Sequence, residues 1–176
     1  MSTINIQYHK STYGELIIGE FENKICLCDW RYRKMRSAID KRIQDGLNAE
    51  YIENPNPVIS KMIDQLEEYY NGDRTDFDIP LLLVGTDFQK QVWDELIKIP
   101  FGKTETYLGL SRKLNNEKAI RAVASANGAN AISIVVPCHR IIGSNGELTG
   151  YAGGLPTKKK LLKLESKDQS EQLDLF

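Results

Sequence analysis

The sequence predicts a mixed α+β protein, with a strand-rich first part followed by a mostly helical second part. Alternation of apolar and polar residues with a period of two is confined to the first 80 residues. Beyond Gly85, apolar residues recur at the three- and four-residue spacing of amphipathic helices. We therefore expect an N-terminal α/β structural domain over residues 1–82, a helical C-terminal domain over residues 85–165 and a flexible polar tail over residues 166–176.

The composition is that of a globular protein of 176 residues, with 41% hydrophobic and 27% charged residues. No apolar run approaches the ~20 residues of a membrane-spanning helix. The N-terminus lacks a basic start followed by an apolar core, so we expect neither a signal peptide nor membrane association. The three cysteines cannot all pair with one another, which favours reduced thiols and a cytoplasmic location.

Local signatures define the elements of the N-terminal domain. Asn56 is a suitable N-cap, Pro57 suits the first position of a helix, and Gly72 would end that helix. The polar stretch at residues 22–24 is typical of a hairpin turn. The expected elements, in order, are strands within residues 4–8, 13–21 and 25–30, helices over 34–47 and from 57, and a short strand over 77–81.

The C-terminal domain should be built from helices. Thr86 and Gln89 have the spacing of a capping box, and Pro100 should end the segment that they open. The expected helices begin at residue 86, span 106–114 and 117–127, and begin again at 157. The middle two, joined by a tight turn, match a helix-turn-helix, although most short helix pairs bind no DNA.

Charge is distributed unevenly along the chain. Residues 1–80 carry a net charge of −4, whereas residues 98–165 carry eleven basic and four acidic side chains, a net charge of +7. A basic half fits either a polyanionic partner or an ordinary solvated lysine surface. Within the helix at 117–127, residues 119–127 are short-sided, with Arg121 as the one long polar residue in their middle, so this helix is poorly suited to reading base edges. We expect any binding to nucleic acid to be largely independent of sequence.

The candidate reactive residue is Cys138. The aliphatic run before it, residues 133–136, predicts a buried strand or extended segment. Pro137 should keep this segment extended, and His139 and Arg140 follow Cys138 directly. A buried cysteine is usually inert, but two polar neighbours that must also be buried favour a functional role.

Two further features lie beyond this cysteine. Residues 149–154 form a Gly-rich loop that lacks the spacing of a phosphate-binding loop but would let a planar ligand pack against its backbone. Glu165 stands near the end of the last helix, where an acidic side chain is disfavoured, which indicates a partner for it. Cys26 and Cys28 lack partnering ligands nearby, so we expect packing residues and no metal site.

Several motifs in the second half of the chain occur together in a specific order. They are Gly85-Thr86-x-Phe88-Gln89-x-x-Val92-Trp93, Ile99-Pro100-Phe101-Gly102-x-Thr104-x-Thr106-Tyr107, Arg121-Ala122-Val123, Asn127-Gly128 with Asn130, Pro137-Cys138-His139-Arg140 and Tyr151-Ala152-Gly153-Gly154. In these motifs the chain resembles the O6-alkylguanine-DNA alkyltransferase family over roughly residues 85–165. Residues 1–80 fit that family's ribonuclease-H-like domain only in general character.

The resemblance implies DNA repair by a suicide methyltransferase. Such a protein transfers an alkyl group from O6-alkylguanine, and also from O4-alkylthymine, in duplex DNA to its own cysteine. The base is flipped out of the stack into the site. The resemblance further implies a monomer that binds the DNA minor groove without strong sequence preference and needs no cofactor or metal. Since Cys138 is present, the chain differs from alkyltransferase-like proteins, which cannot accept the alkyl group.

The resemblance also implies residue roles. Cys138 would accept the alkyl group after a proton relay through water to His139, which Glu165 would orient. Tyr107 would assist the leaving guanine and contact a phosphate, and Arg121 would fill the vacated stack position. The residues implied for DNA binding are Arg121, Tyr107, Ala122, Ser125, Asn127 and Gly128. Those implied for substrate binding are Asn130, Cys138, Ile141, Tyr151 and Ala152. The residues with a structural role are Arg140 and Asn130.

The tail ends in Gln172-Leu173-Asp174-Leu175-Phe176, so three large apolar residues close a polar segment. It resembles the bacterial sliding-clamp binding motif, with Gln172, Leu173, Leu175 and Phe176 as the contact residues. Docking onto its own domain is the alternative.

Two other functions stay open for the whole chain. One is a non-catalytic alkylation-damage sensor or DNA-binding regulator, and the other is a cysteine hydrolase that turns over repeatedly.

Overall fold

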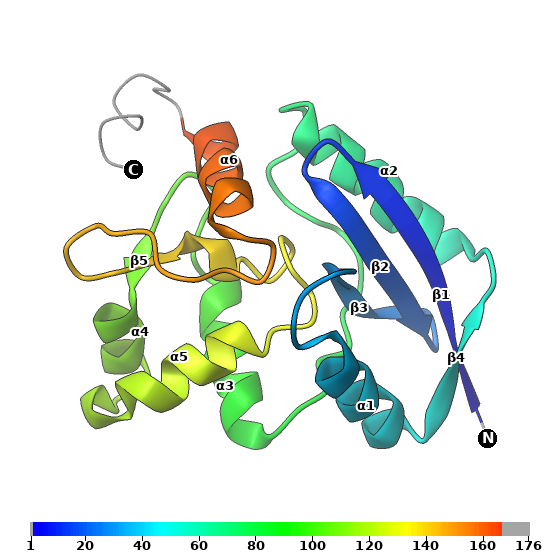
Figure 1. Cartoon of the computed structure of the whole chain (residues 1–176), viewed down its shortest axis with the longest axis horizontal. Coiled ribbons are helices and arrows are strands. Elements are labelled where there is room, and N and C mark those ends of the chain that lie inside the picture. Colours follow the sequence, from blue (N-terminus) through cyan, green and yellow to red (C-terminus); the bar gives the residue numbers. More distant parts are fainter. Residues whose placement is uncertain (1, 167–176) are drawn as a thin grey trace. The chain divides into compact units, whose positions relative to one another are not determined.

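The structure is a computed structural model that describes residues 2–166 (Figure 1). The chain forms two compact units, divided between Thr86 and Asp87, just after the Gly85 at which the sequence suggested a boundary. The tail residues Gln172, Leu173, Leu175 and Phe176 lie outside the described residues. Within residues 2–166, no helix is long and apolar enough to cross a membrane.

The N-terminal unit is built on a four-stranded sheet with the order β3-β2-β1-β4. Its strands are β1 (Ser2–Ser11), β2 (Gly14–Phe21), β3 (Lys24–Trp30) and β4 (Ala49–Glu53). The first three strands are antiparallel neighbours, and the hairpin between β2 and β3 is the one that the sequence predicted, whereas β4 runs parallel to β1. Glu22 and Asn23 take positive φ angles of 51° and 66°, which is the geometry of a tight hairpin turn between β2 and β3.

Two helices complete this unit. Helix α1 (Arg36–Leu47) connects β3 to β4, and helix α2 (Pro57–Tyr70) packs against β1, β2 and β3 (Figure 1). The predicted start of α2 is confirmed, because the Asn56 side chain accepts hydrogen bonds from the amides of Val58 and Ile59. Apolar side chains on one face of α2 are fully buried against the sheet.

One expectation for the N-terminal unit was wrong, and one strand was not predicted. The strand expected over residues 77–81 is absent, and only an isolated bridge joins Leu81 to Ile25. Pro80 has no amide hydrogen to give a ladder, and the Asp78 amide donates to the Gln65 side chain instead. Strand β4 was missed because, of its five residues, only Ala49 is buried, so no alternating pattern marks it.

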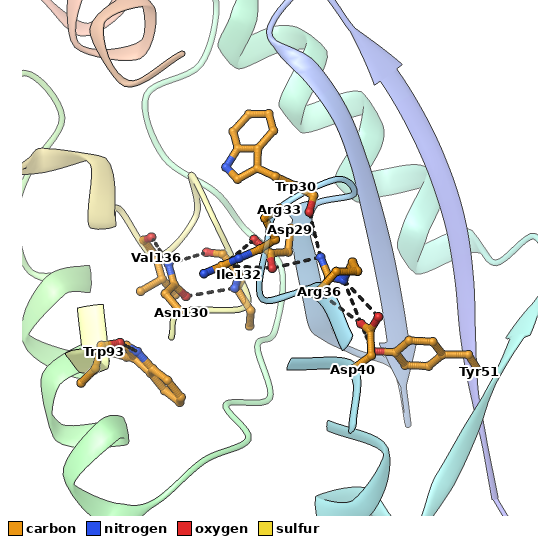
Figure 2. Close-up of polar contacts among 11 residues, drawn as sticks. Asp29, Trp30, Arg33, Arg36, Asp40, Tyr51, Trp93, Asn130, Ile132 and Val136 are labelled. Carbon is orange, nitrogen blue, oxygen red and sulfur yellow. Dashed lines mark hydrogen bonds and ion pairs between the residues drawn. The ribbon is translucent and has the colours of Figure 1, made fainter. Parts of the chain in front are cut away.

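An ion-pair network fixes the segment between β3 and α1 (Figure 2). Asp29 is fully buried and accepts from both Arg33 and Arg36 at 3.1–3.3 Å. Arg36 also pairs with Asp40 one helical turn further on, and Asp40 accepts a hydrogen bond from the Tyr51 hydroxyl. The network therefore joins β3, α1 and β4 within the N-terminal unit.

The C-terminal unit is mostly helical, as predicted. Its elements are α3 (Asp87–Ile97), β5 (Glu105–Thr106), α4 (Tyr107–Lys113), a 3-10 turn η1 (Glu117–Ala119), α5 (Ile120–Gly128), a second 3-10 turn η2 (Cys138–Arg140), β6 (Ile141–Ile142) and α6 (Leu155–Glu165). Helix α3 packs against α4 and α5, and the indole nitrogen of Trp93 donates to the Ala126 carbonyl at 2.8 Å. Helices α4 and α5 form the predicted helix-turn-helix (Figure 1).

Helix boundaries in this unit differ from the expectations by a few residues. The helix expected over 117–127 opens with the 3-10 turn η1 before α5 begins at Ile120. Helix α6 begins at Leu155, two residues before the expected start, since Pro156 is compatible with the first turn of a helix.

Candidate active site

The segment before Cys138 is a series of turns, and the strand expected over residues 133–136 is absent (Figure 2). The Asn130 side chain organises it: its oxygen accepts from the Ile132 amide at 2.9 Å, and its nitrogen donates to the Val136 carbonyl at 2.8 Å. Ile134 takes a φ of +73°, which is unfavourable for a β-branched residue. The aliphatic run correctly indicated burial, but the Asn130 amide, which replaces sheet partners, decided the conformation.

Cys138, His139 and Arg140 form the 3-10 turn η2, whereas the sequence suggested an extended segment. All three are buried, with Cys138 4% exposed, His139 fully buried and Arg140 6% exposed. In a 3-10 turn, each side chain is rotated by about one third of a turn from the one before it. Consecutive residues therefore do not point to opposite sides, as they do in a strand.

Glu165 is the common partner of the two residues that follow Cys138. His139 Nε2 lies 2.8 Å from Glu165 Oε2. Arg140 donates through Nε to Oε1 at 2.8 Å and through a terminal nitrogen to Oε2 at 3.0 Å. The acidic residue at the end of α6 therefore has the partners that its position implied, and the pairing joins α6 to η2.

Arg140 also reaches the segment after α3. A terminal nitrogen donates to the Ile99 carbonyl at 2.6 Å. Gly102, in the same segment, has a φ of +80°, and a Cβ there would meet the Glu165 carbonyl at 3.1 Å. Glycine thus lets this loop approach the end of α6 closely. One guanidinium and one close backbone approach hold three parts of the unit together around Glu165.

The electrostatics of the pair favour a neutral histidine and an ionised glutamate. Burial lowers the pKa of His139, and the charges of Arg140 and Lys158 lower it further, against the opposing influence of Glu165. Burial raises the pKa of Glu165, but its interactions with His139 and Arg140 outweigh that effect and bring the pKa to about 2. With His139 neutral, Arg140 is the cation that keeps Glu165 ionised.

This pairing selects one tautomer of His139. An ionised carboxylate only accepts hydrogen bonds, so the hydrogen-bond network assigns the ring proton to Nε2. The lone pair then lies on Nδ1, which is buried and has no hydrogen-bond partner among residues 2–166. His139 can therefore accept a proton at Nδ1, the behaviour of a general base.

Tyr107 and the Gly-rich loop lie next to each other, close to the chain that follows Cys138. Strand β5 pairs in parallel with β6, with Thr106 opposite Ile142, so the first residue of α4 comes close to the chain that follows Cys138. The Tyr107 hydroxyl lies 2.9 Å from Thr149 Oγ1, and its side chain is half-buried. The Tyr151 ring stands edge-on to the His139 ring with centroids 6.4 Å apart.

The other residues implied for substrate contact are Ile141 and Ala152. Ile141 follows η2 directly and is fully buried, whereas Ala152 is half-exposed in the loop beside Tyr151. Of the implied substrate residues, Asn130 is bonded to the carbonyl of Val136, two residues before Cys138, and Tyr151 contacts the ring of His139, the residue after it.

Helix α5 presents one exposed face. The exposed residues Arg121, Ala122, Ser125 and Gly128 recur at positions that share this face. Asn127, which the resemblance grouped with them, is only 6% exposed and lies on the buried side, with its side-chain oxygen unpaired among residues 2–166. The small side chains of the exposed face leave the backbone of α5 accessible to a large partner.

Lys158 is a buried residue that the sequence reasoning missed. Its ammonium group donates to the Ile141 carbonyl at 2.5 Å and to the Thr149 carbonyl at 3.3 Å. The signal was in the helical spacing, because Lys158 shares the three- and four-residue spacing of Leu161 and Leu162, which are buried. Burial lowers the pKa of Lys158 to about 8, although the neighbouring Cys138 opposes this change.

The other cysteines have a different environment. Cys26 and Cys28 are buried on β3 and free of disulfides. Burial raises the pKa of Cys26 to about 12 and raises that of Cys28 as well. Among residues 2–166, no group of three or more histidine, cysteine, aspartate or glutamate side chains could hold a metal ion. Cys138 thus stands apart as the thiol with a base at the next position.

A buried cysteine beside an oriented histidine base, in a helical unit that carries a helix-turn-helix, defines a class of nucleophilic-cysteine proteins acting on DNA. Family models agree with this description. Residues 87–167 match the model described as 6-O-methylguanine DNA methyltransferase, DNA binding domain. Residues 4–83 match the model described as 6-O-methylguanine DNA methyltransferase, ribonuclease-like domain.

Individual relatives give the same result. The chain is 47% identical over 123 residues to a methylated-DNA–protein-cysteine methyltransferase of Mycobacterium bovis, covering 69% of this chain and 74% of the relative. It is 54% identical over 101 residues to one of Methanosarcina acetivorans, covering 57% and 65%. The chain therefore belongs to the methylated-DNA–protein-cysteine methyltransferase family.

Solved structures extend the similarity to nearly the whole chain. The O6-methylguanine methyltransferase of Mycobacterium tuberculosis is 34% identical, with a TM-score of 0.78, covering 96% of this chain and 94% of that one. A structure of the Mycobacterium tuberculosis protein in complex with DNA is 35% identical, with a TM-score of 0.78 and coverage of 98% and 99%.

The Asn130 turn gives a first testable prediction. Asn130→Ala should lower the free energy of unfolding by roughly 2–4 kcal/mol, because it leaves buried amide and carbonyl groups of the turn without partners. Urea unfolding at neutral pH measures the change. Asn116→Ala is the matched control, since Asn116 is exposed and its side chain makes no capping bond. Equal stability of both variants would show that Asn130 does not hold the turn.

Proposed function

We propose that this chain repairs alkylated DNA by transferring the alkyl group from O6 of guanine to the sulfur of Cys138, irreversibly and once per molecule. The observation that carries the proposal is that His139, the residue directly after Cys138, is buried and paired with Glu165 at 2.8 Å. Membership of the methylated-DNA–protein-cysteine methyltransferase family supports the same reaction. O4-alkylthymine, which presents a similar alkyl–oxygen bond, is a second proposed substrate.

The proposed first step makes the thiolate. A free thiol with a pKa of ~8.5 is mostly protonated at neutral pH, so a base must remove its proton. The proton passes from Cys138 through a water molecule to Nδ1 of His139, the nitrogen that the pairing with Glu165 leaves able to accept it. The resulting imidazolium is stabilised by the ionised carboxylate of Glu165.

The second step is the transfer itself. The thiolate of Cys138 attacks the alkyl carbon, a sulfur–carbon bond forms, and the carbon–oxygen bond to guanine breaks with its electron pair left on the base. The leaving guanine needs a proton or a hydrogen bond, and the Tyr107 hydroxyl is the donor that we assign to it. The thioether product is stable, and nothing in the proposed mechanism reverses it.

The DNA is proposed to lie against the exposed face of α5. Its small residues Ala122, Ser125 and Gly128 allow close approach to the minor groove, with little means of reading sequence. Arg121 on the same face fills the position from which the target base is flipped. Asn127, being buried, would act through the helix backbone or its packing.

Around the flipped base we assign a set of substrate contacts. Backbone groups of Cys138, Ile141 and Ala152 read the guanine edge, and Tyr151, beside the His139 ring, covers the base. Asn130 fixes the turn that leads to Cys138, and Arg140 braces Glu165 without entering the chemistry. Residues 85–165 thus carry catalysis and DNA binding, whereas residues 1–82 are assigned a structural role.

The setting of the reaction is part of the proposal. The three cysteines are free thiols, which suits a reducing compartment such as the cytoplasm. We propose a monomer without cofactor or metal.

The central prediction is a single covalent change. Incubation with a duplex containing O6-methylguanine should add one methyl group to the intact protein, and peptide mapping by mass spectrometry should locate it on Cys138. Cys138→Ser should stay unmodified. An unmodified native protein that still binds the duplex would favour a damage sensor or DNA-binding regulator, and repeated turnover would favour a hydrolase.

The three assigned side chains should give different kinetic defects in single-turnover transfer. Glu165→Gln should slow transfer at least about 10-fold with little change in DNA affinity, because the imidazolium loses its carboxylate. Tyr107→Phe should also slow transfer. Arg121→Ala should slow transfer from duplex DNA more than from a single strand, in which the base needs less unstacking. Unchanged rates for Glu165→Gln would remove the carboxylate from the mechanism.

The C-terminal pentapeptide is proposed to bind a bacterial sliding clamp. The proposal rests on the spacing of Gln172, Leu173, Leu175 and Phe176 alone, because these residues lie outside the described part of the chain. A peptide of residues 166–176 should bind a bacterial clamp saturably in a fluorescence titration, and replacement of Leu175 and Phe176 by alanine should abolish binding. Absence of saturable binding by the native peptide would refute the proposal.

A further inference from the structure

Lys158 is a charged side chain in the interior of the C-terminal unit that the proposed chemistry leaves unused. It is fully buried on α6, a rare environment for lysine. Its ammonium group donates to the carbonyls of Ile141 and Thr149, at 2.5 Å and 3.3 Å. A lysine without a function would be expected to extend its ammonium group into solvent, as long side chains at helix surfaces do.

The two carbonyls belong to two different segments of the candidate site. Ile141 is three residues after Cys138 and begins β6. Thr149 begins the Gly-rich loop, and its hydroxyl lies 2.9 Å from the Tyr107 hydroxyl. Lys158 is therefore bonded directly to the Cys138 side of the site and, through Thr149, to the tyrosine side.

Within residues 2–166, the ammonium group of Lys158 has no carboxylate partner. It makes hydrogen bonds to two carbonyl groups and has two electrostatic neighbours. Those neighbours, both on η2, are the Cys138 thiol and the His139 imidazole. Glu165, on the same helix, is already shared between His139 and Arg140. An uncompensated buried cation is costly, so an anion beside Lys158 would be strongly favoured. Cys138 is the neighbouring group that can supply one.

We infer that Lys158 is a positioning residue for alkyl transfer, whose charge favours the thiolate form of Cys138 and whose bond to Thr149 sets the Tyr107 hydroxyl. This inference rests on the proposed function for the transfer step but not for the thiolate. His139 removes the proton from Cys138, and Lys158 stabilises the anion that remains. Both residues are needed, because a neutral histidine can accept the proton but cannot supply the positive charge that stabilises the thiolate.

The titration of Lys158 agrees with this role. With a pKa lowered to about 8, mainly by burial, the side chain still carries its charge at neutral pH and loses it as the pH rises through that value. The thiolate should therefore be favoured most strongly below pH 8, where a free thiol is least ionised.

The test is a titration of the Cys138 thiolate in the full chain without DNA. Ultraviolet absorbance of the thiolate is followed against pH, and the signal of Cys138→Ser is subtracted to remove Cys26 and Cys28. Lys158→Met should raise the apparent pKa of Cys138 by about 1 unit or more, the usual effect of losing an adjacent opposite charge. Lys160→Met, on an exposed position of the same helix, should leave it unchanged.

Further variants separate charge from packing. Lys158→Arg keeps the charge and should restore a low thiolate pKa. Lys158→Gln keeps hydrogen-bond donors but removes the charge. It therefore tests the effect of the charge on the thiolate pKa if Lys158→Met does not fold. Thr149→Val should leave the thiolate titration unchanged but slow methyl transfer, since it breaks only the link to Tyr107. A native titration curve in the folded Met or Gln variant overturns the inference.

Failure of the inference can be told from failure of the proposed function. A shifted titration in a protein that never accepts a methyl group would refute alkyl transfer and leave the role of Lys158 at the thiolate intact. Methyl transfer to Cys138 with an unshifted titration would support alkyl transfer and refute the role of Lys158 at the thiolate.

Discussion

The carboxylate of Glu165 is the interaction on which the candidate site depends. It holds His139 and Arg140 at once, and Arg140 continues to the Ile99 carbonyl, so three segments distant in sequence meet at one charge. The same contact fixes the tautomer of His139, whose imidazole is kept neutral mainly by burial, against the influence of Glu165. Structure and proposed chemistry therefore share one residue, and a change at Glu165 affects both.

Asn130 has a comparable role for the backbone. Its amide supplies the hydrogen bonds that a strand would have obtained from neighbours, which allows the chain to turn sharply at Ile134 despite a positive φ. The turns then lead into η2, where Cys138 is placed by backbone geometry. The thiol of Cys138, which follows a hydrogen-bonded turn, is held without help from a larger sheet.

The sequence predicted those features that depend on local signals. The hairpin at residues 22–24, the cap at Asn56 and the helix-turn-helix each have a local signature, and each is present. Features that depend on contacts between residues distant in sequence were not predicted. Strand β4 has one buried residue, the turns before Cys138 resemble a strand in composition, and Lys158 resembles a surface lysine until its helical position is compared with Leu161.

The three cysteines show why burial alone does not decide reactivity. Cys26 and Cys28 are buried on β3, and burial raises their pKa values, with the carboxylates of Glu20 and Asp29 acting on Cys26 and Cys28 in the same direction. Cys138 is nearly as buried, but a neutral histidine follows it and the ammonium of Lys158 is its electrostatic neighbour. Burial therefore has opposite effects on the two kinds of thiol. It raises the pKa of a thiol that has no cation nearby, and it strengthens the electrostatic effect of a fixed cation on a thiol beside it.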